Sequence, residues 1–309
     1  MITSIFKKST PINYSLLGIL MVLVFFLYQF HTTIGATTSS GMMQKVVLLG
    51  VLFASLFFSN FIVKKNGLTK DSSYTILFYF LFLLFFPKIF NNVNLLLANF
   101  FILLSMRRLI SLQTLKSPKE KIFDAALWIF VASLFHFWCI LFIIVVYISI
   151  LFHVSRDYRN WLVPFIAFFV TATIFIFYAL AIDKTAINTY LQSETINFQL
   201  DYFSNKYQNI AFSMYTVFVL FFIFPFIFSL TGKPLNLQAS YKKVVFTTLI
   251  GIIIFLISTN KSNEVLVFTF LPMAIMATNT IEYLQLKLQQ EIILFIAIAC
   301  GFFCFFSQL

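Results

Sequence analysis

The sequence alternates long apolar runs with short polar stretches along its whole length. A helix needs about 20 apolar residues to cross the ~30 Å hydrocarbon core of a bilayer. The apolar runs cover roughly residues 13–30, 45–63, 73–90, 92–106, 122–153, 160–182, 211–231, 243–259, 264–282 and 290–307. The stretches between them are too short for a soluble domain. The pattern therefore predicts an all-α, polytopic transmembrane helix bundle that forms a single transmembrane domain over residues 1–309.

Composition supports this class. Hydrophobic residues make up 61% of the chain and charged residues 10%, whereas soluble domains carry about a quarter of their residues as charges. Cys139, Cys300 and Cys304 all fall within apolar runs without the spacing of metal ligands, so we interpret them as small buried hydrophobic residues and expect neither a metal nor a cofactor. The apolar run after Lys7 and Lys8 is longer than a signal peptide requires, which predicts a retained first helix.

The basic residues predict how the chain is threaded through the membrane, because Lys and Arg accumulate in cytoplasmic loops. With a cytoplasmic N-terminus, the basic loops at 64–72 and 107–121 are also cytoplasmic. The run 122–153 would be ~48 Å long as one helix, which overshoots a single crossing. If it forms a hairpin of two short helices that meet near His136, the later basic residues stay inside as well, namely Arg156, Arg159, Lys233, Lys242 and Lys243. We therefore predict about nine full spans plus this hairpin, in a bacterial inner membrane, with a periplasmic C-terminus.

His136 lies at the predicted junction of that hairpin, within the sequence LFHFWCILF. Two helices that meet inside the bilayer expose backbone groups that protein or trapped water must satisfy. The favoured interpretation is that the imidazole of His136 and the indole of Trp138 supply these bonds. A proton shuttle or phosphate contact is the alternative, because ionisable residues inside a membrane are candidates for function.

Polar residues predicted to face the periplasm form three clusters, at 87–94, 183–210 and 258–268. Asn, Lys and Ser commonly fill short turns because they solvate helix ends. Lys88 and Lys261, however, lie where positive charge is avoided, and a basic group there suits a lipid phosphate. The lipid- or substrate-binding candidates on this side are Lys88, Asn91, Asn92, Lys261 and Glu264, in addition to His136. We predict that Lys88, Lys261 and Glu264 face one common cavity, while the 183–210 segment forms either an interfacial lid or a plain connection.

On the cytoplasmic side, all four arginines flank the predicted hairpin: Arg107, Arg108, Arg156 and Arg159. The planar guanidinium binds phosphates through paired hydrogen bonds, which makes these residues candidates for contacts with anionic lipids. A role as topological anchors explains their placement equally. The net charge of +11 is expected along the membrane edge, so we predict membrane lipids as partners and no nucleic acid.

Three segments carry a resemblance over essentially the whole chain: MITSIFKKSTPINY, NVNLLLANFFILLSMRRLISL and STNKSNEVLVFTFLPMAIMA. They resemble a family of uncharacterised polytopic inner-membrane proteins from flavobacteria and related Bacteroidota. The order of short basic loops, a His-containing helix pair and a polar outer turn is similar, in architecture only, to polyprenyl-dependent membrane glycosyltransferases and exopolysaccharide polymerases. That resemblance implies an acidic catalytic base in the first outer loop, but here the loop HTTIGATTSSGMMQK has no acid.

Two functional hypotheses follow. The first is a non-catalytic or catalytically degenerate inner-membrane protein that binds a lipid, or another envelope membrane protein, during cell-envelope assembly. The second is an enzyme that acts on a polyprenyl-linked glycan at the periplasmic face. His31, Asp183, Asp201 or Glu264 would then have to replace the missing base. The acid-free first loop favours the first hypothesis.

Overall fold

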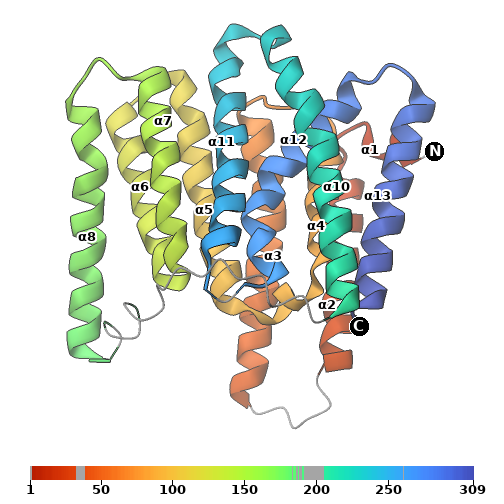
Figure 1. Ribbon diagram of the computed structural model, residues 1–309, viewed down its shortest axis with the longest axis horizontal. Coiled ribbons are helices and arrows are strands. Elements are labelled where there is room, and N and C mark those ends of the chain that lie inside the picture. Colours follow the sequence, from red (N-terminus) through yellow and green to blue (C-terminus); the bar gives the residue numbers. More distant parts are fainter. Residues whose placement is uncertain are drawn as a thin grey trace. The chain divides into compact units, whose positions relative to one another are not determined.

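The structure is a computed structural model that describes residues 2–32, 39–182, 184, 185, 187, 190, 205–259 and 261–309. Every regular element in this part of the chain is helical (Figure 1). The α-helices are α1 Ile2–Phe6, α2 Pro11–Thr32, α3 Ser39–Lys65, α4 Tyr74–Phe85, α5 Val93–Ser111, α6 Pro118–Phe135, α7 Ile143–His153, α8 Arg159–Ala181, α10 Lys206–Ser229, α11 Leu235–Ile257, α12 Phe270–Tyr283 and α13 Lys287–Ser307. Short 3-10 helices are η1 Pro87–Asn91, η2 Leu112–Thr114, η3 Phe137–Phe142, η4 Leu230–Gly232 and η5 Asn263–Thr269.

The all-α polytopic bundle predicted from the apolar runs is confirmed, and each run contains helical structure. Within the described residues, 8 helices are long and apolar enough to cross a membrane. The run 73–90 differs from the expected full span, because α4 has only 12 residues, or ~18 Å. The cause is Pro87, which cannot continue a helix from Phe86 and instead starts η1.

The chain divides into two compact units, each assembled from separate stretches of sequence. Unit 1 comprises Met1–Leu96, Asp201–Thr231 and Thr269–Leu309; unit 2 comprises Leu97–Leu200 and Gly232–Phe268. The division into two units cannot be predicted from the apolar runs, because it depends on which helices pack together. The single transmembrane domain therefore stays a prediction.

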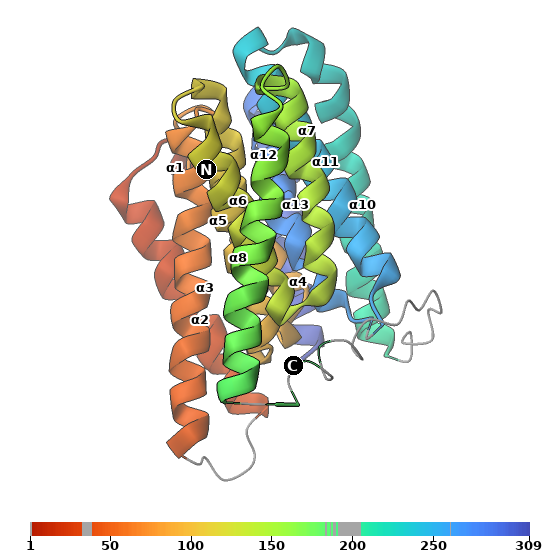
Figure 2. The same ribbon diagram turned by 90° about the vertical axis from the view of Figure 1, so that its left-hand side faces the viewer.

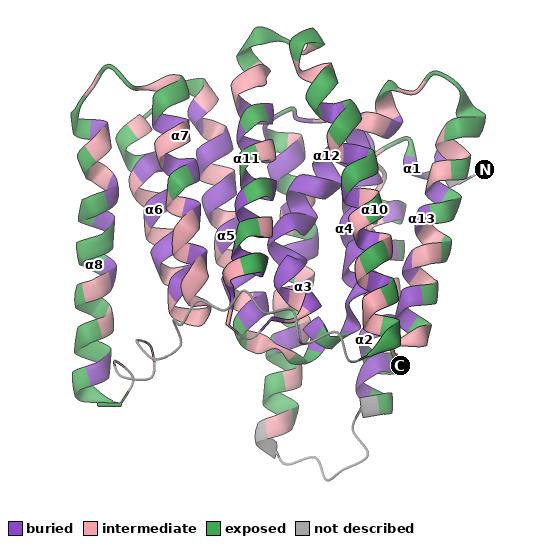
Figure 3. Ribbon diagram, in the orientation of Figure 1, coloured by how far each residue is buried: buried purple, intermediate pink, exposed green. Residues whose placement is uncertain are grey.

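Unit 1 is organised around α4. All residues of this helix are buried, and it packs against α3, α12 and α13. A helix that is apolar on all sides belongs in the centre of a bundle. Figure 3 shows α12 buried along most of its length, whereas α10 and α13 expose much of their surface.

The centre of unit 1 contains a dense aromatic cluster around Tyr215 of α10. Its ring centroid lies 5.4–6.0 Å from those of Phe82, Phe85, Phe86 and Phe270. The Tyr215 hydroxyl shares a 2.6 Å hydrogen bond with the hydroxyl of Thr269. A tyrosine in an apolar interior is favourable when its hydroxyl has such a partner, so this cluster fixes α10 against α4 and α12.

The two chain termini lie at opposite ends of unit 1. At one end, the Tyr74 hydroxyl at the start of α4 donates to the Thr3 carbonyl. At the other end, the Gln308 amide donates to the carbonyl of Phe85, the last residue of α4. An odd number of membrane crossings between the termini would have this property; the predicted threading itself stays a prediction.

Unit 2 contains the predicted hairpin. The helix α6 ends at Phe135, His136 adopts an extended backbone (φ −144°, ψ 104°), and the chain returns through η3 and α7. The α6 and α7 helices lie side by side in both views (Figures 1 and 2). The hairpin is confirmed, but its first arm is longer than expected, since 18 residues correspond to ~27 Å. The junction at His136 is therefore nearly a full bilayer thickness from the start of α6.

The opposite end of unit 2 collects basic residues. Lys243 of α11 is 1% exposed, and its ammonium donates to the carbonyl of Leu109 and lies 3.1 Å from His153 Nε2. Lys121 donates to the Ser111 carbonyl at 2.8 Å. Leu109 and Ser111 belong to the last turn of α5, whose carbonyls lack helical partners and carry the negative end of the helix dipole. Two lysines therefore cap α5.

Candidate functional site

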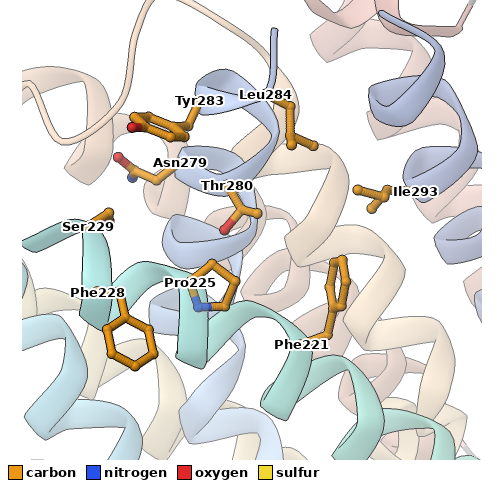
Figure 4. Close-up of a pocket in the computed structure, with 9 residues that line it drawn as sticks. All are labelled: Phe221, Pro225, Phe228, Ser229, Asn279, Thr280, Tyr283, Leu284 and Ile293. Atoms are coloured by element: carbon orange, nitrogen blue, oxygen red, sulfur yellow. The ribbon is translucent and has the colours of Figure 1, made fainter. Parts of the chain in front are cut away.

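A cavity in which polar side chains meet apolar ones lies within unit 1, between α10, α12 and α13. It has a volume of 360 Å³. Figure 4 shows Asn279, Thr280 and Tyr283 projecting from α12, with Pro225 of α10 opposite Thr280. The remaining lining residues are Phe221, Phe228, Ser229, Leu284 and Ile293. The cavity is thus mostly apolar with a few polar groups, which is typical of binding sites for small molecules.

A second cavity of 280 Å³ adjoins the first. The two share Phe221 and Ile293, and the remaining residues of the second are Met214, Val217, Phe218, Ile296 and Cys300. We call the two cavities together the α10–α13 groove. Its first part contains hydroxyl and amide groups, whereas its second part has none, so the groove is polar at one end and apolar at the other.

The polar end of the groove lies at the basic end of unit 1. Glu282, next to Tyr283, accepts hydrogen bonds from the Lys70 amide (2.9 Å) and the Ser72 hydroxyl (2.6 Å). Lys287 begins α13 immediately after the α12–α13 turn. The basic residues of this end outnumber its acids, Asp71, Glu282 and Glu291; they are Lys7, Lys8, Lys64, Lys65, Lys70 and Lys287. Positive charge at a membrane edge attracts anionic headgroups.

Three of the lipid- or substrate-binding candidates predicted for the periplasmic side belong to unit 1, and two of them form hydrogen bonds next to helix ends. The Asn92 side chain accepts from the Leu95 amide at 3.1 Å, which makes it the N-cap of α5. Asn91 accepts from the Gln29 amide at 2.7 Å. Lys88 is exposed. These contacts match the ordinary alternative, in which polar residues solvate helix ends, for Asn91 and Asn92.

The outer candidates in unit 2 lie on and beside η5. Lys261 is 9% exposed, and the carboxylate of Glu264 accepts from the Ser262 hydroxyl at 3.3 Å. Because Lys88 belongs to unit 1 and the other two residues to unit 2, the common cavity of Lys88, Lys261 and Glu264 stays a prediction. Of the predicted lid within 183–210, 18 of the 28 residues lie outside the described residues, so the lid stays a prediction.

The structural role expected for His136 and Trp138 is wrong. The backbone at the junction satisfies itself, since the His136 amide donates to Ala132 and the Cys139 amide donates to His136, both at 3.0 Å. In the part of the chain that is described, neither His136 Nε2 nor Trp138 Nε1 has a hydrogen-bond partner. The His136 ring instead packs on Phe268, with centroids 5.6 Å apart. A 3-10 turn closes the junction without help from side chains, which the sequence pattern did not reveal.

Because the imidazole Nε2 makes no hydrogen bond within the described residues, replacing His136 should have a small effect on stability. Exchanging a half-buried polar ring of this kind for an apolar ring of similar shape is nearly neutral. His136→Phe should therefore change the free energy of unfolding by less than ~1 kcal/mol. The matched control is His153→Phe, which removes the partner of the Lys243 ammonium and should destabilise the protein by ~1–3 kcal/mol. Thermal unfolding in detergent compares the two, and a larger loss for His136→Phe would restore a structural role for the imidazole.

The arginines predicted to contact anionic lipids lie at the basic end of unit 2. Arg108 forms a 2.7 Å ion pair with Asp124. Asp157 accepts from the Arg159 amide at 3.0 Å and pairs with Lys119 at 3.1 Å; the hydrogen bond from Lys119 lowers the pKa of its carboxyl group. Arg107 and Arg156 lie at the same end of the unit. Since local carboxylates already hold Arg108 and Lys119, a role as anchors accounts for part of this cluster, and lipid contact stays a prediction.

The groove itself was missed in the sequence. Its signal was the polar pair Asn279 and Thr280 in the apolar run MAIMATNTIEY, together with Pro225 within another run. A polar residue inside a membrane span is a candidate for function. Without knowing which helix faces meet, however, the sequence could not bring these residues together.

An all-α bundle of membrane-spanning helices with an amphiphilic groove defines a polytopic membrane protein. The chain belongs to a family of unknown function, DUF6427, whose model matches residues 1–309. Comparisons with curated proteins and with solved structures give no match. This match agrees with the resemblance to an uncharacterised family that covers the whole chain. The bacterial source of that family and the similarity to polyprenyl-dependent glycosyltransferases stay expectations.

Proposed function

We propose that this chain is an integral protein of a bacterial inner membrane that binds a lipid in the α10–α13 groove. The single observation that carries the proposal is that a partly polar cavity adjoins a fully apolar one, with Phe221 and Ile293 lining both. A lipid has the same division, because its headgroup needs polar partners and its chain does not.

The length of the groove is suitable for the acyl chain of a lipid. Along α10 it runs from Met214 to Ser229, or ~22 Å at 1.5 Å per residue. One leaflet of the hydrocarbon core is ~15 Å thick, so a chain entering at the polar end would pass the middle of the bilayer. The groove opens at the surface of unit 1, since its lining residue Val217 is 65% exposed, and an apolar surface there suits the hydrocarbon of a bilayer.

The proposed role is non-catalytic binding within cell-envelope assembly, in which the lipid-bound chain acts with other membrane proteins. The absence of an acid from HTTIGATTSSGMMQK supports a binding role over a catalytic one, because general-base catalysis needs a positioned proton acceptor.

Photocrosslinking tests the occupancy of the groove. The purified full chain is reconstituted with a phospholipid that carries a photoactivatable group in its acyl chain, and the crosslinked residues are mapped by mass spectrometry. We expect crosslinks to concentrate on the groove residues Met214, Phe218, Ile296 and Cys300. Ile296→Trp should fill the apolar cavity and remove most of these crosslinks.

The matched control is Phe295→Trp, an exposed neighbour on α13 that does not line the groove. It should leave the crosslinking pattern unchanged. Crosslinks spread evenly over the exposed faces of α10 and α13, with no effect of Ile296→Trp, would show ordinary contact with bulk lipid and refute the proposal.

The proposed orientation has its own test. In a background without Cys139, Cys300 and Cys304, single cysteines replace the exposed residues Lys65, Lys88 and Ser155. A membrane-impermeant thiol reagent added to intact spheroplasts should label position 88 and spare positions 65 and 155, because the basic ends of both units are expected to face the cytoplasm. The reverse labelling pattern would invert the whole orientation.

A further inference from the structure

The hydroxyl groups at the polar end of the groove have already used their hydrogens. The Ser229 hydroxyl donates to the Phe226 carbonyl at 2.8 Å. The Thr280 hydroxyl donates to the Met276 carbonyl at 2.9 Å. A hydroxyl has one hydrogen and two acceptor lone pairs, so both residues present acceptors to a ligand.

The neighbouring polar groups also offer a ligand acceptors and no donors from their amide groups. Asn279 spends both amide hydrogens, on the Leu68 carbonyl (3.1 Å) and the Ile275 carbonyl (2.9 Å). Pro225 has no backbone N–H, so the Phe221 carbonyl loses the helical hydrogen bond that residue 225 would otherwise donate. Among the described lining residues, Tyr283 is the remaining hydroxyl that can donate to a ligand. The polar end is therefore rich in acceptors and poor in donors.

Charge narrows the class of ligand further. Among the residues that the structure describes, no acidic side chain lines the groove, and an ammonium group moved out of water without a carboxylate partner is strongly disfavoured. Hydroxyl donors carry no such penalty once they are hydrogen-bonded. The lysines at this end, including Lys70 and Lys287, attract a phosphate that carries net negative charge.

We infer that the groove selects an anionic phospholipid whose headgroup donates hydrogen bonds through hydroxyls, as a glycerol headgroup does. The headgroup hydroxyls bond to Ser229, Thr280 and the Phe221 carbonyl, and the acyl chain follows the apolar cavity. This inference rests on the proposed function and adds the identity of the lipid.

Native mass spectrometry tests the selectivity. The delipidated full chain is offered equimolar phosphatidylglycerol, phosphatidylethanolamine and phosphatidylcholine with identical acyl chains. Phosphatidylcholine has no headgroup donor, and phosphatidylethanolamine donates only through an ammonium. Since each neutral hydrogen bond favours binding by about fivefold, two bonds predict retention of phosphatidylglycerol over phosphatidylcholine by about 25-fold.

A double variant, Ser229→Ala with Thr280→Val, removes two of the three acceptors and keeps the Phe221 carbonyl, so it should lower this ratio at least about fivefold. The matched control is Ser213→Ala with Thr173→Val, two exposed residues outside the groove whose hydroxyls also donate to helix carbonyls; it should keep the full ratio. Thermal unfolding checks that both double variants fold.

The outcomes separate the two proposals. Equal retention of the three lipids, preference for phosphatidylethanolamine, or an unchanged ratio in the groove variant would each overturn the inference about the headgroup. If crosslinks still concentrate on Met214 and Ile296 in those cases, lipid binding in the groove stands. If they do not, the proposed function fails as well.

Discussion

Replacing Lys243 with glutamate is expected to eliminate most of the folded protein. Lys243 is 1% exposed, and its ammonium donates to the Leu109 carbonyl and to His153 Nε2. The second bond requires neutral His153 with its proton on Nδ1. Glutamate would place a buried carboxylate against two acceptors and the negative end of the α5 dipole. Leaving a buried charge without its partner costs ~3–5 kcal/mol, a large part of the ~5–15 kcal/mol that stabilises a typical protein.

The neighbouring lysine provides the control. Lys242 is exposed, with its ammonium 5.7 Å from the centre of the Phe152 ring, so Lys242→Glu should cost less than ~1 kcal/mol. Lys243→Met, which loses the hydrogen bonds without adding a charge, should fall between the two. Yield of monodisperse protein after size-exclusion chromatography and thermal unfolding rank the three variants. Equal behaviour of Lys243→Glu and Lys242→Glu would mean that the α5 end does not depend on this ammonium.

Truncating Tyr215 to alanine should destabilise unit 1 by ~3–5 kcal/mol, because it opens a cavity among four packed aromatic rings. Tyr215→Phe keeps the ring and loses only the hydrogen bond to Thr269, so it should cost ~1 kcal/mol. The control Tyr207→Ala removes the same atoms from a residue on α10 that is 54% exposed. Thermal unfolding should show a decrease of roughly 10 °C for Tyr215→Ala. A decrease no larger than that of Tyr207→Ala would show that the aromatic cluster is not a centre of stability.

The sequence predicted the helices and the hairpin because both depend on quantities that can be read along the chain. Apolar run length predicted the spans, and the excess length of 122–153, together with the basic residues that follow it, predicted the turn near His136. In each unit the basic residues assigned to the cytoplasm gather at one end, as the capping of α5 by Lys243 and Lys121 illustrates.

The groove and the role of His136 could not be predicted because they depend on which helix faces meet. Asn279 and Thr280 became part of a site only through the approach of α10, which ends at Ser229, and of one face of the neighbouring α13. For His136, the sequence indicated a polar ring at a helix break, but it did not indicate that the main chain would close the break by itself.

The short central helix α4 constrains the order in which the protein can be assembled. At ~18 Å, α4 does not reach across the bilayer by itself, and its packing partners α12 and α13 begin about 200 residues later in the chain. At ~5–20 residues per second, ribosomes need ~10–40 s to supply those partners. During that interval α4 has to be sheltered by α3, by the insertion machinery or by a membrane chaperone. Stop codons placed before α13 should therefore yield a fragment that is degraded, because its earliest central helix never receives its last-made neighbour.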